Sequence, residues 1–342
     1  MKTVYIKLTN VCQLHCAHCY NSICPATDTM SLETLGCIKH RLENLCKLGE
    51  TIHVTFHGGE PMLYPYLDEV IDFVRYFKGK GYDINFSATT NLVYPLSEQK
   101  KELFREFATN EQGKPIISTS YDYNIRFKDI DEEKFWFDNV LVLINDGFDV
   151  RPIITVTKPL IQWTTGGYFL IQFSTVGITS CNFERITCTG RASDNKDTLI
   201  PTNRETDEWL EKTYKQYKSM DPLTMHIPLF DILEDSIKFG KLSGCRARQC
   251  TCDVITFNPD GSIATCPNIA DKIVGNVSAP ETEEYCRMKK DLRSLENIRR
   301  SECYTCQYYQ YCNGDCFQLN WDETGCPGLI KIMEDILCEH VT

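Results

Sequence analysis

The distribution of cysteine constrains this chain more than any other feature of its sequence. Of its 342 residues, 19 are cysteine, and many of these stand in short clusters. The odd total, and an N-terminus without an apolar export segment, argue against a secreted disulfide scaffold. Thiols in the cytosol stay reduced, so clustered cysteines there indicate metal ligands. We therefore expect a cytosolic (cytoplasmic) protein organised around metal centres.

Charge and hydropathy exclude two classes of protein. Lysine and arginine number 36 against 47 aspartates and glutamates, which gives a net charge of −11. Nucleic-acid binders use basic surfaces to neutralise phosphates, so we expect no nucleic-acid partner. No apolar run approaches the roughly 20 residues that span a bilayer, so we expect no membrane association. The most basic stretch, residues 287–300, is interpreted as the solvated face of a helix.

Short apolar runs alternate with amphipathic stretches over the first two-thirds of the chain. The expected strands are Val4–Leu8, Ile52–Phe56, Ile84–Ser87, Ile116–Ser120, Ile153–Val156 and Ile178–Phe183, and the expected helices are Leu32–Leu48, Tyr66–Lys78, Glu98–Phe107 and Glu132–Asn145. Ser31 is the expected N-cap of the first helix and Gly49 its stop. This alternation predicts an α/β fold with a parallel sheet. Six units are too few to close an eight-unit barrel, so we expect a partial (β/α)6 TIM-like barrel with its chemistry at the C-terminal strand ends.

Changes in residue pattern and cysteine content divide the chain into three parts. Residues 1–202 are expected to form the partial barrel, and residues 203–243 a helical bridge. The bridge is interpreted as two helices on either side of Pro222 that link domains rather than add to the core. A boundary near Ser243-Gly244 opens the cysteine-rich domain, residues 244–342. There, Pro259-Asp260-Gly261 predicts a hairpin turn that places Cys266 at the end of a returning strand.

The first cysteine cluster follows the first expected strand directly. Cys12, Cys16 and Cys19 have the spacing C-x3-C-x2-C. Three thiolates on one loop fit a cuboidal iron–sulfur cluster and leave one iron open, as catalytic metal sites require. The alternative is a zinc site completed by His15 or His18.

These cysteines resemble the signature of the radical S-adenosylmethionine (SAM) superfamily. The resemblance implies a 4Fe–4S cluster whose open iron chelates the amino and carboxylate groups of SAM. An electron from the cluster then breaks the sulfonium C–S bond, and a 5′-deoxyadenosyl radical abstracts hydrogen from a substrate. Tyr20 follows the third cysteine and is a candidate cofactor contact. His18 stands where the family usually has an aromatic residue.

A second motif lies at the end of the second expected strand. Gly58-Gly59-Glu60-Pro61 resembles the GGEP motif, whose backbone and glutamate hold the methionine amino group in the family. Two glycines allow close approach of main chain to a ligand and free its polar groups. The resemblance also makes Thr89, Ser120 and Arg126 candidate cofactor contacts, since they fall in or after Thr-Asn-Gly-like and Ser-x-Asp-Gly-like segments. Residues 187–192 resemble a loop of many relatives, without a definite role.

The C-terminal cysteines resemble a SPASM extension, which is typical of peptide- and protein-modifying radical enzymes. The closest pattern is that of anaerobic sulfatase maturases, and it implies two auxiliary 4Fe–4S clusters. The first ligand set is Cys245, Cys250, Cys266 and Cys316, and the second is Cys303, Cys306, Cys312 and Cys326. Cys252 is an alternative to Cys250, and Cys338 to Cys326, which is preferred because a helix-like run, Leu329–Leu337, follows it. Two interleaved zinc sites would fit the same spacings.

One departure narrows the expected activity. Sulfatase maturases place an acidic base directly after the cysteine that corresponds to Cys266, where this chain has Pro267. Only eleven residues precede Cys12, so we expect no leader-peptide-binding domain at the N-terminus. The general base is left open.

Our hypothesis is a radical SAM oxidoreductase that modifies a peptide or protein side chain. The products implied are a thioether, a carbon–carbon cross-link or a dehydrogenated residue, with flavodoxin or ferredoxin as electron donor. The alternatives are a sulfatase-maturase-like enzyme or small-molecule dehydrogenase, and a non-catalytic iron–sulfur electron carrier. A carrier would not need Gly58–Pro61.

Overall fold

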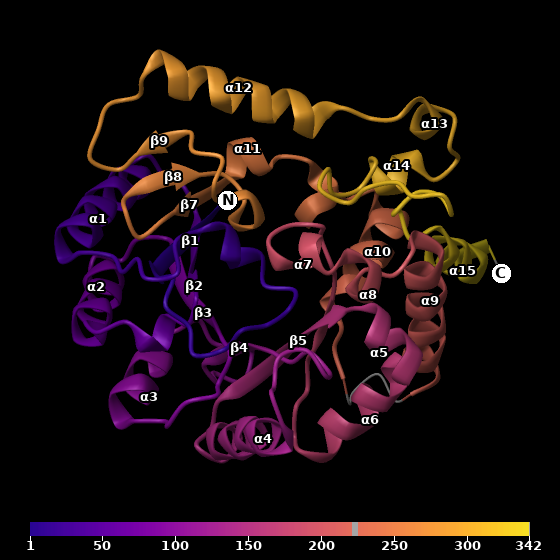
Figure 1. Cartoon of the computed structure of the whole chain (residues 1–342), viewed down its shortest axis with the longest axis horizontal. Coiled ribbons are helices and arrows are strands. Elements are labelled where there is room, and N and C mark those ends of the chain that lie inside the picture. The colour runs from indigo at the N-terminus through magenta and orange to yellow at the C-terminus, as the bar shows by residue number, and fades with distance from the viewer. Residues whose placement is uncertain (221–224, 342) are drawn as a thin grey trace.

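Six parallel strands follow one another in chain order in this computed structural model, which describes residues 1–220 and 225–341. They are β1 (Lys2–Thr9), β2 (Ile52–Gly58), β3 (Ile84–Thr90), β4 (Ile116–Ser120), β5 (Asp149–Val156) and β6 (Asn182–Arg185). The sheet order β6-β5-β4-β3-β2-β1 leaves β6 at an edge, so the sheet is open. This is the expected partial barrel, and helices run around its outside (Figure 1).

The four predicted helices begin and end close to their expected positions, and they are α1 (Leu32–Lys47), α2 (Leu67–Gly79), α3 (Glu98–Arg105) and α4 (Ile130–Asn145). Four shorter helices were not predicted: α5 (Lys158–Trp163) and α6 (Gly166–Thr175) between β5 and β6, and α7 (Arg191–Asp194) and α8 (Lys196–Leu199) after β6. Ser31 caps α1, because its hydroxyl accepts a hydrogen bond from Thr34 N at 3.1 Å. Gly49 follows the last turn with a φ of +79°, as a helix stop requires. Both predictions are confirmed.

The expected range of the sixth strand is wrong. The strand covers Asn182–Arg185 rather than Ile178–Phe183. Gly177 turns the chain after α6, and Ser180 then pairs with His226 instead of with β5. Apolar content alone does not separate this connecting segment from the strand that follows it.

Each barrel strand has a buried outer face and a more polar inner face. On β5 and β6, Ile154 and Phe183 are paired in register and buried on the helix side. Their neighbours Thr155 and Glu184, also paired, therefore point to the inner face. The inner face of β1 carries Tyr5 by the same alternation. This polar interior distinguishes the barrel from one filled entirely by apolar packing.

The expected bridge proves to be part of the core. Helices α9 (Asn203–Ser219) and α10 (Pro228–Phe239) bury one apolar face each, with Trp209 and Phe230 among the enclosed side chains. The prediction of a link that adds little to the core is therefore wrong, because these helices pack against α6 and α15. Pro222 lies outside the described residues.

The C-terminal cysteine region, residues 244–341 of the described chain, continues the barrel sheet. Its elements are α11 (Cys250–Asp253), β7 (Val254–Phe257), β8 (Ser262–Ala264), β9 (Gly275–Asn276), α12 (Glu283–Asn297), α13 (Ser301–Tyr304), α14 (Tyr309–Cys312) and α15 (Ile330–Val341). Strand β7 pairs in parallel with β1, and the predicted hairpin joins β7 to β8. The helix predicted after Cys326 is α15. The proposed domain boundaries stay a prediction, since one sheet runs through both parts.

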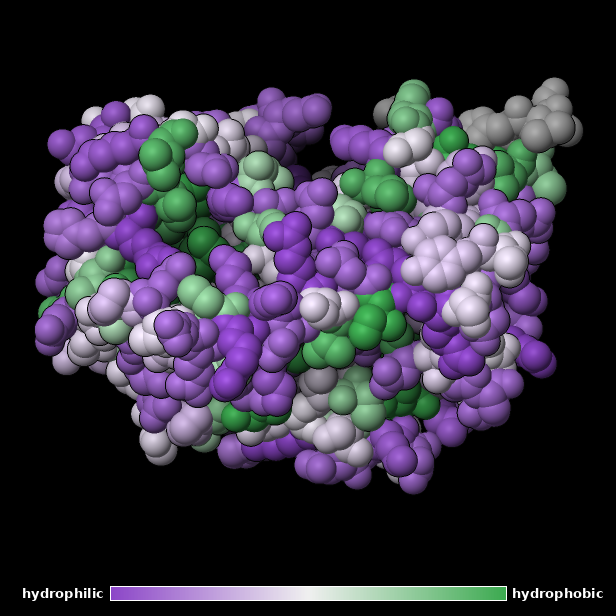
Figure 2. All heavy atoms as spheres, turned by 90° about the horizontal axis from the view of Figure 1, so that it is seen from above, coloured by the Kyte–Doolittle hydropathy of each residue, from purple (hydrophilic) through white to green (hydrophobic). Residues whose placement is uncertain are grey.

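Helix α12 lies across the C-terminal cysteine region, at the top of Figure 1. The face seen from that side is mostly hydrophilic, with hydrophobic residues in scattered patches (Figure 2). The basic residues 287–297 fall within this helix, which buries only Leu292 and Glu296, so the prediction of a solvated helix face is confirmed for them. Among the described helices, none combines the length and apolar character needed to cross a membrane.

Candidate functional site

The cysteine loop is fastened where β1 ends. Gly59 N donates a hydrogen bond to Thr9 O at 2.7 Å, and Glu60 N donates to Val11 O at 2.8 Å. A Cβ atom on Gly58 would lie 2.2 Å from Thr9 O, so only glycine fits there. These two amides are therefore engaged within the protein, and the contact of the motif with the methionine amino group stays a prediction. The two amides hold the segment that leads into Cys12.

The Glu60 carboxylate joins the ends of β2 and β3. It is fully buried, and its oxygens accept hydrogen bonds from Met62 N (3.0 Å), the Thr90 hydroxyl (2.7 Å) and Asn91 N (2.7 Å). Burial raises the pKa of Glu60 to about 7, although these three donors favour its ionised form. Its expected contact with the methionine amino group stays a prediction, and its observed partners are protein groups.

The three loop cysteines meet the requirements of a cluster site. Leu14 N lies 3.4 Å from Cys12 Sγ, and the Asn91 side-chain amide lies 3.7 Å from the same atom. Burial raises the pKa of Cys12 to about 11 and raises that of Cys16. A buried thiol ionises only where positive charge stabilises it, and a metal centre supplies such charge. Enclosed cysteines with N–H donors at sulfur therefore fit an iron–sulfur cluster.

Asp122 binds residues on the other side of the cysteine loop, and no role was predicted for it from the sequence. Its Oδ2 lies 2.7 Å from Arg126 Nε and 3.3 Å from His18 Nε2, while Oδ1 accepts from Thr155 N at 3.0 Å. Burial would raise its pKa, but Arg126 and His18 hold that pKa far below the usual range. Arg126, predicted to meet the SAM carboxylate, is thus already paired. The Ser-x-Asp motif carried the signal for Asp122.

The remaining predicted contacts lie around the same end of the barrel. The Tyr20 hydroxyl lies 2.8 Å from His57 Nε2. Thr89 and Ser120 are half-buried at the ends of β3 and β4 on the inner side, and Pro61 opens a short 3-10 helix (Pro61–Leu63). Their contacts with the cofactor stay predictions.

The loop at residues 187–192 has a definite place in the structure. Arg191 N donates to Cys19 O at 3.2 Å, and a Cβ atom on Gly190 would lie 2.4 Å from that oxygen. The loop therefore supports the third cysteine of the first cluster, a role that the sequence did not reveal.

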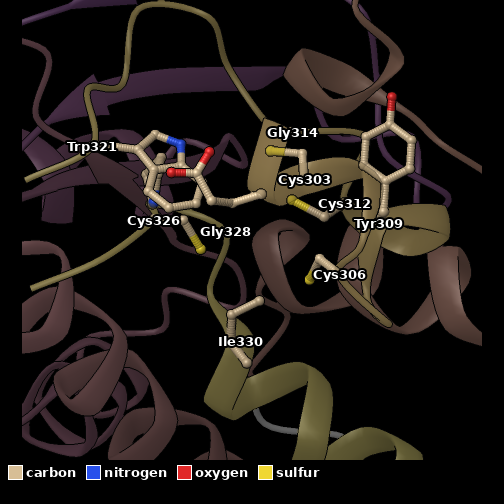
Figure 3. A pocket seen from close by; sticks show the side chains of 11 residues that line it. Cys303, Cys306, Tyr309, Cys312, Gly314, Trp321, Cys326, Gly328 and Ile330 are labelled. Carbon is tan, nitrogen blue, oxygen red and sulfur yellow. The ribbon is translucent and has the colours of Figure 1, made fainter. Parts of the chain in front are cut away.

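Four cysteines of the C-terminal cysteine region converge on one pocket (Figure 3). Cys303, Cys306, Cys312 and Cys326 line it together with Tyr309 and Trp321. These four are the second ligand set predicted from the sequence, and they come from α13, the turn after it, α14 and the loop before α15. Cys338 lies on α15 and is not part of this lining. The arrangement favours Cys326, and the ligand set stays a proposal.

The cysteines of the first auxiliary set, Cys245, Cys250, Cys266 and Cys316, also lie near one another. Cys245 and Cys316 share a hydrogen bond, which lowers the pKa of Cys316 to about 7. Gln318 Nε2 lies 3.2 Å from Cys266 Sγ. Burial raises the pKa of Cys250 to about 12, and the charges of Cys266 and Cys316 add to this.

Cys252, the alternative to Cys250, points to a different place. It lines a separate cavity together with Lys2 and Arg41, beside the hairpin of β7 and β8. The geometry thus favours Cys250 as a ligand.

The zinc alternatives stay open. A structural zinc site needs four ligands in a compact tetrahedron, whereas a 4Fe–4S cluster is held by cysteines around a larger cuboid. Across residues 1–220 and 225–341, no three or more His, Cys, Asp or Glu side chains are arranged so that they could hold one metal ion.

Comparison with known proteins agrees with this site. Residues 6–118 match the family model of the Radical SAM superfamily. Among solved structures, anSMEcpe with bound AdoMet has 17% identity and a TM-score of 0.77, and the match covers 99% of this chain and 98% of that one. A structure of anSMEcpe with AdoMet and the Kp18Cys peptide has 18% identity and a TM-score of 0.79, with 99% and 97% covered. No curated protein matches the chain in sequence.

A third similar structure is Streptococcus suis SuiB bound to precursor peptide SuiA. It has 15% identity and a TM-score of 0.60, with 92% of this chain and 71% of that chain covered. At such low sequence identities these structures show the fold of the chain, and the family match of residues 6–118 indicates the type of chemistry. Residues 6–118 match the radical SAM family, and the chain as a whole has the fold of these solved structures. S-adenosylmethionine and a 4Fe–4S cluster are its cofactors.

Proposed function

We propose that this enzyme oxidises a side chain of a peptide or protein substrate, forming a thioether, a carbon–carbon cross-link or a dehydrogenated residue. The observation that carries the proposal is the pocket lined by Cys303, Cys306, Cys312 and Cys326, beside a second gathered set of four cysteines. Two further clusters near a radical SAM site supply electron acceptors, which an oxidation requires. The peptides bound in similar structures support the substrate class.

Each part of the site has a task in this proposal. Cys12, Cys16 and Cys19 would hold the catalytic cluster, and bound SAM supplies hydrogen-abstracting radical chemistry. Glu60 and Asp122 fix the loops around it through buried hydrogen bonds. Flavodoxin or ferredoxin is the proposed electron donor, and a cytoplasmic location is part of the same proposal.

The first test measures 5′-deoxyadenosine formed by anaerobically reconstituted protein with SAM and dithionite. Wild type should form it, and a Cys12/Cys16/Cys19→Ala variant should not. A panel of synthetic peptides, which includes Kp18Cys and peptides that offer Ser, Lys, Tyr or Trp as the reacting residue, then tests the substrate class by mass change. No 5′-deoxyadenosine from iron-replete wild type would favour the electron-carrier alternative. 5′-Deoxyadenosine without any peptide product would favour a small-molecule substrate.

A further inference from the structure

Oxidation of a side chain by two electrons needs a group that accepts a proton. After one hydrogen atom has left the substrate, one proton and one electron must still leave. Pro267 offers no acceptor beside Cys266, so the acceptor must come from elsewhere in the chain. The candidates are the titratable groups near the inner ends of the barrel strands.

Most of these groups are already engaged. Glu60 is fully buried with three hydrogen-bond donors, and Asp122 is 1% exposed and paired with Arg126. Lys7 is fully buried, and its ammonium group lies 2.8 Å from the Asn21 side-chain oxygen. A substrate cannot reach any of these groups without rearrangement.

His57 is a poor proton acceptor for a different reason. Its Nε2 lies 2.8 Å from the Tyr20 hydroxyl, and burial lowers its pKa to about 3. A group with so low a pKa binds a proton weakly at neutral pH.

Resting on the proposed function, we propose that Glu184 is the catalytic residue that takes the proton from the substrate. It stands on the inner face of β6, the edge strand of the open barrel, with an exposed side chain. Asn182 Nδ2 donates to its Oε1 at 2.9 Å. Among the described residues, no hydrogen bond reaches its Oε2, so one oxygen is available to a substrate.

Glu184 is connected through its neighbouring strand to the cysteine loop of the predicted radical site. Its partner in register, Thr155, donates its amide to Asp122, which holds Arg126 and His18 beside the cysteine loop. Glu184 therefore lies one strand away from the predicted radical site. The strand end that carries it is part of the rim around that site.

Tyr5 connects Glu184 with the auxiliary cysteines. Burial raises the pKa of the Tyr5 phenol, and the negative charges of Cys266 and Glu184 raise it further. The phenol is thus within electrostatic reach of both groups. Strand β6 also reaches toward the cluster that Cys245, Cys250, Cys266 and Cys316 would hold, because Arg185 beside Glu184 pairs with Asp315, which directly precedes Cys316.

The environment of Glu184 also suits a base. Its side chain is exposed to solvent, and the protein atoms around it raise its pKa by partial burial. Arg185 lowers that pKa only in part, because its guanidinium points away and pairs with Asp315 at 2.6 Å. A raised pKa makes a carboxylate a more effective proton acceptor near neutral pH.

The proposed oxidation moves two hydrogens and two electrons out of the substrate. A substrate C–H bond breaks and its hydrogen atom ends in 5′-deoxyadenosine. A neighbouring S–H, N–H, O–H or C–H bond then gives its proton to the Glu184 carboxylate, and a C–S or C–C bond or a double bond forms. The remaining electron goes to an oxidised iron–sulfur cluster, the acceptor that the proposal requires. The substrate thus loses two electrons and two hydrogens.

The test compares Glu184→Gln and Glu184→Asp with the control Glu111→Gln, which alters an exposed carboxylate in the turn before β4. The probe is whichever panel peptide wild type modifies. Glu184→Gln should lower the amount of product per 5′-deoxyadenosine by about 100-fold or more, Glu184→Asp should restore part of it, and Glu111→Gln should match wild type.

Two readouts separate proton transfer from a structural role. Freeze-quenched samples of Glu184→Gln should accumulate a carbon-centred radical in electron paramagnetic resonance spectra. Peptide affinity of the reconstituted protein without reductant, from fluorescence anisotropy, should change less than twofold. A wild-type product ratio in Glu184→Gln would overturn the role of Glu184 and leave the proposed function intact. So would a loss of peptide affinity that equals the loss of product. If wild type modifies no panel peptide, the proposed function fails, and the role of Glu184 fails with it.

Discussion

The barrel and the C-terminal cysteine region are held together by different interactions. In the barrel, strands of up to eight residues and helices of up to 16 bury a continuous apolar core, with Glu60 as a buried polar tie. The C-terminal cysteine region has strands of four, three and two residues. Such short strands enclose little apolar surface, and the region's main apolar contribution comes from α15, whose Ile332, Met333 and Ile336 join the core of the barrel.

Buried charges help to hold the rest of the C-terminal cysteine region together. Asp315 is fully buried and pairs with Arg185 at 2.6 Å and with Arg246 at 3.1 Å. Glu296, also buried, accepts from Thr251 N at 3.1 Å and from Cys250 N. These ties surround the proposed cluster ligands. The barrel thus folds around apolar side chains, whereas the part of the cysteine region outside α15 relies more on buried ionic contacts and, in our proposal, on its clusters.

The largest expected effect is that of removing the buried charge of Asp315. Asp315→Ala leaves two arginines near the protein interior without their carboxylate, which should lower the free energy of unfolding by about 3–5 kcal/mol. Thermal denaturation of the cluster-free protein measures this. The control Asp138→Ala breaks an exposed ion pair with Lys134 and should leave the melting temperature unchanged. Equal melting temperatures for wild type and Asp315→Ala would show that the ionic ties contribute little.

The second effect concerns the polar tie of the barrel and depends on pH. The pKa of Glu60 rises from 4.5 to about 7 on folding, so the folded protein retains a proton that the unfolded chain releases. The stability from this group is therefore complete below about pH 4.5 and is lost as pH rises through 7, by up to about 3 kcal/mol. Urea denaturation of cluster-free wild type and Glu60→Gln between pH 5 and 8 measures the difference. Parallel pH profiles for the two proteins would refute this assignment, and Glu111→Gln should follow wild type throughout.

The third effect tests how tightly the barrel holds the cysteine loop. Gly58→Ala forces a Cβ atom toward Thr9 O at a residue with a φ of +125°, and should cost about 2–3 kcal/mol. Iron bound after reconstitution should also fall, because the segment before Cys12 must shift. Gly79→Ala, in a helix turn with no atom within 4 Å, should be neutral or slightly stabilising. If Gly58→Ala bound iron and melted as wild type does, the loop would not depend on this contact.

The smallest effect compares two helix caps of the same chemistry. The Ser31 hydroxyl caps α1 in the barrel, and the Thr282 hydroxyl caps α12 in the cysteine region. Ser31→Ala should lower the global free energy of unfolding by about 1 kcal/mol, since α1 is packed into the core. Thr282→Ala should leave it unchanged and speed hydrogen exchange within α12, which buries only two side chains. Equal global destabilisation by both variants would show that α12 folds cooperatively with the barrel.

Much of this protein follows from its sequence because the deciding signals are local. Apolar periodicity located five of the six barrel strands, and Ser31 and Gly49 marked the first helix, since propensity and capping act over a few residues. The spacing of Cys12, Cys16 and Cys19 predicted the catalytic loop for the same reason. The turn at Asp260-Gly261 located the hairpin before Cys266.

Only the tertiary structure decided the relations between distant segments. It placed Cys250 rather than Cys252 beside Cys266, and used the amides of Gly59 and Glu60 to fasten the cysteine loop. It also brought Glu184 within electrostatic reach of Tyr5, 179 positions earlier in the chain (184 minus 5). Such choices depend on which faces of separate elements meet in the folded chain. No short-range pattern in the sequence records that.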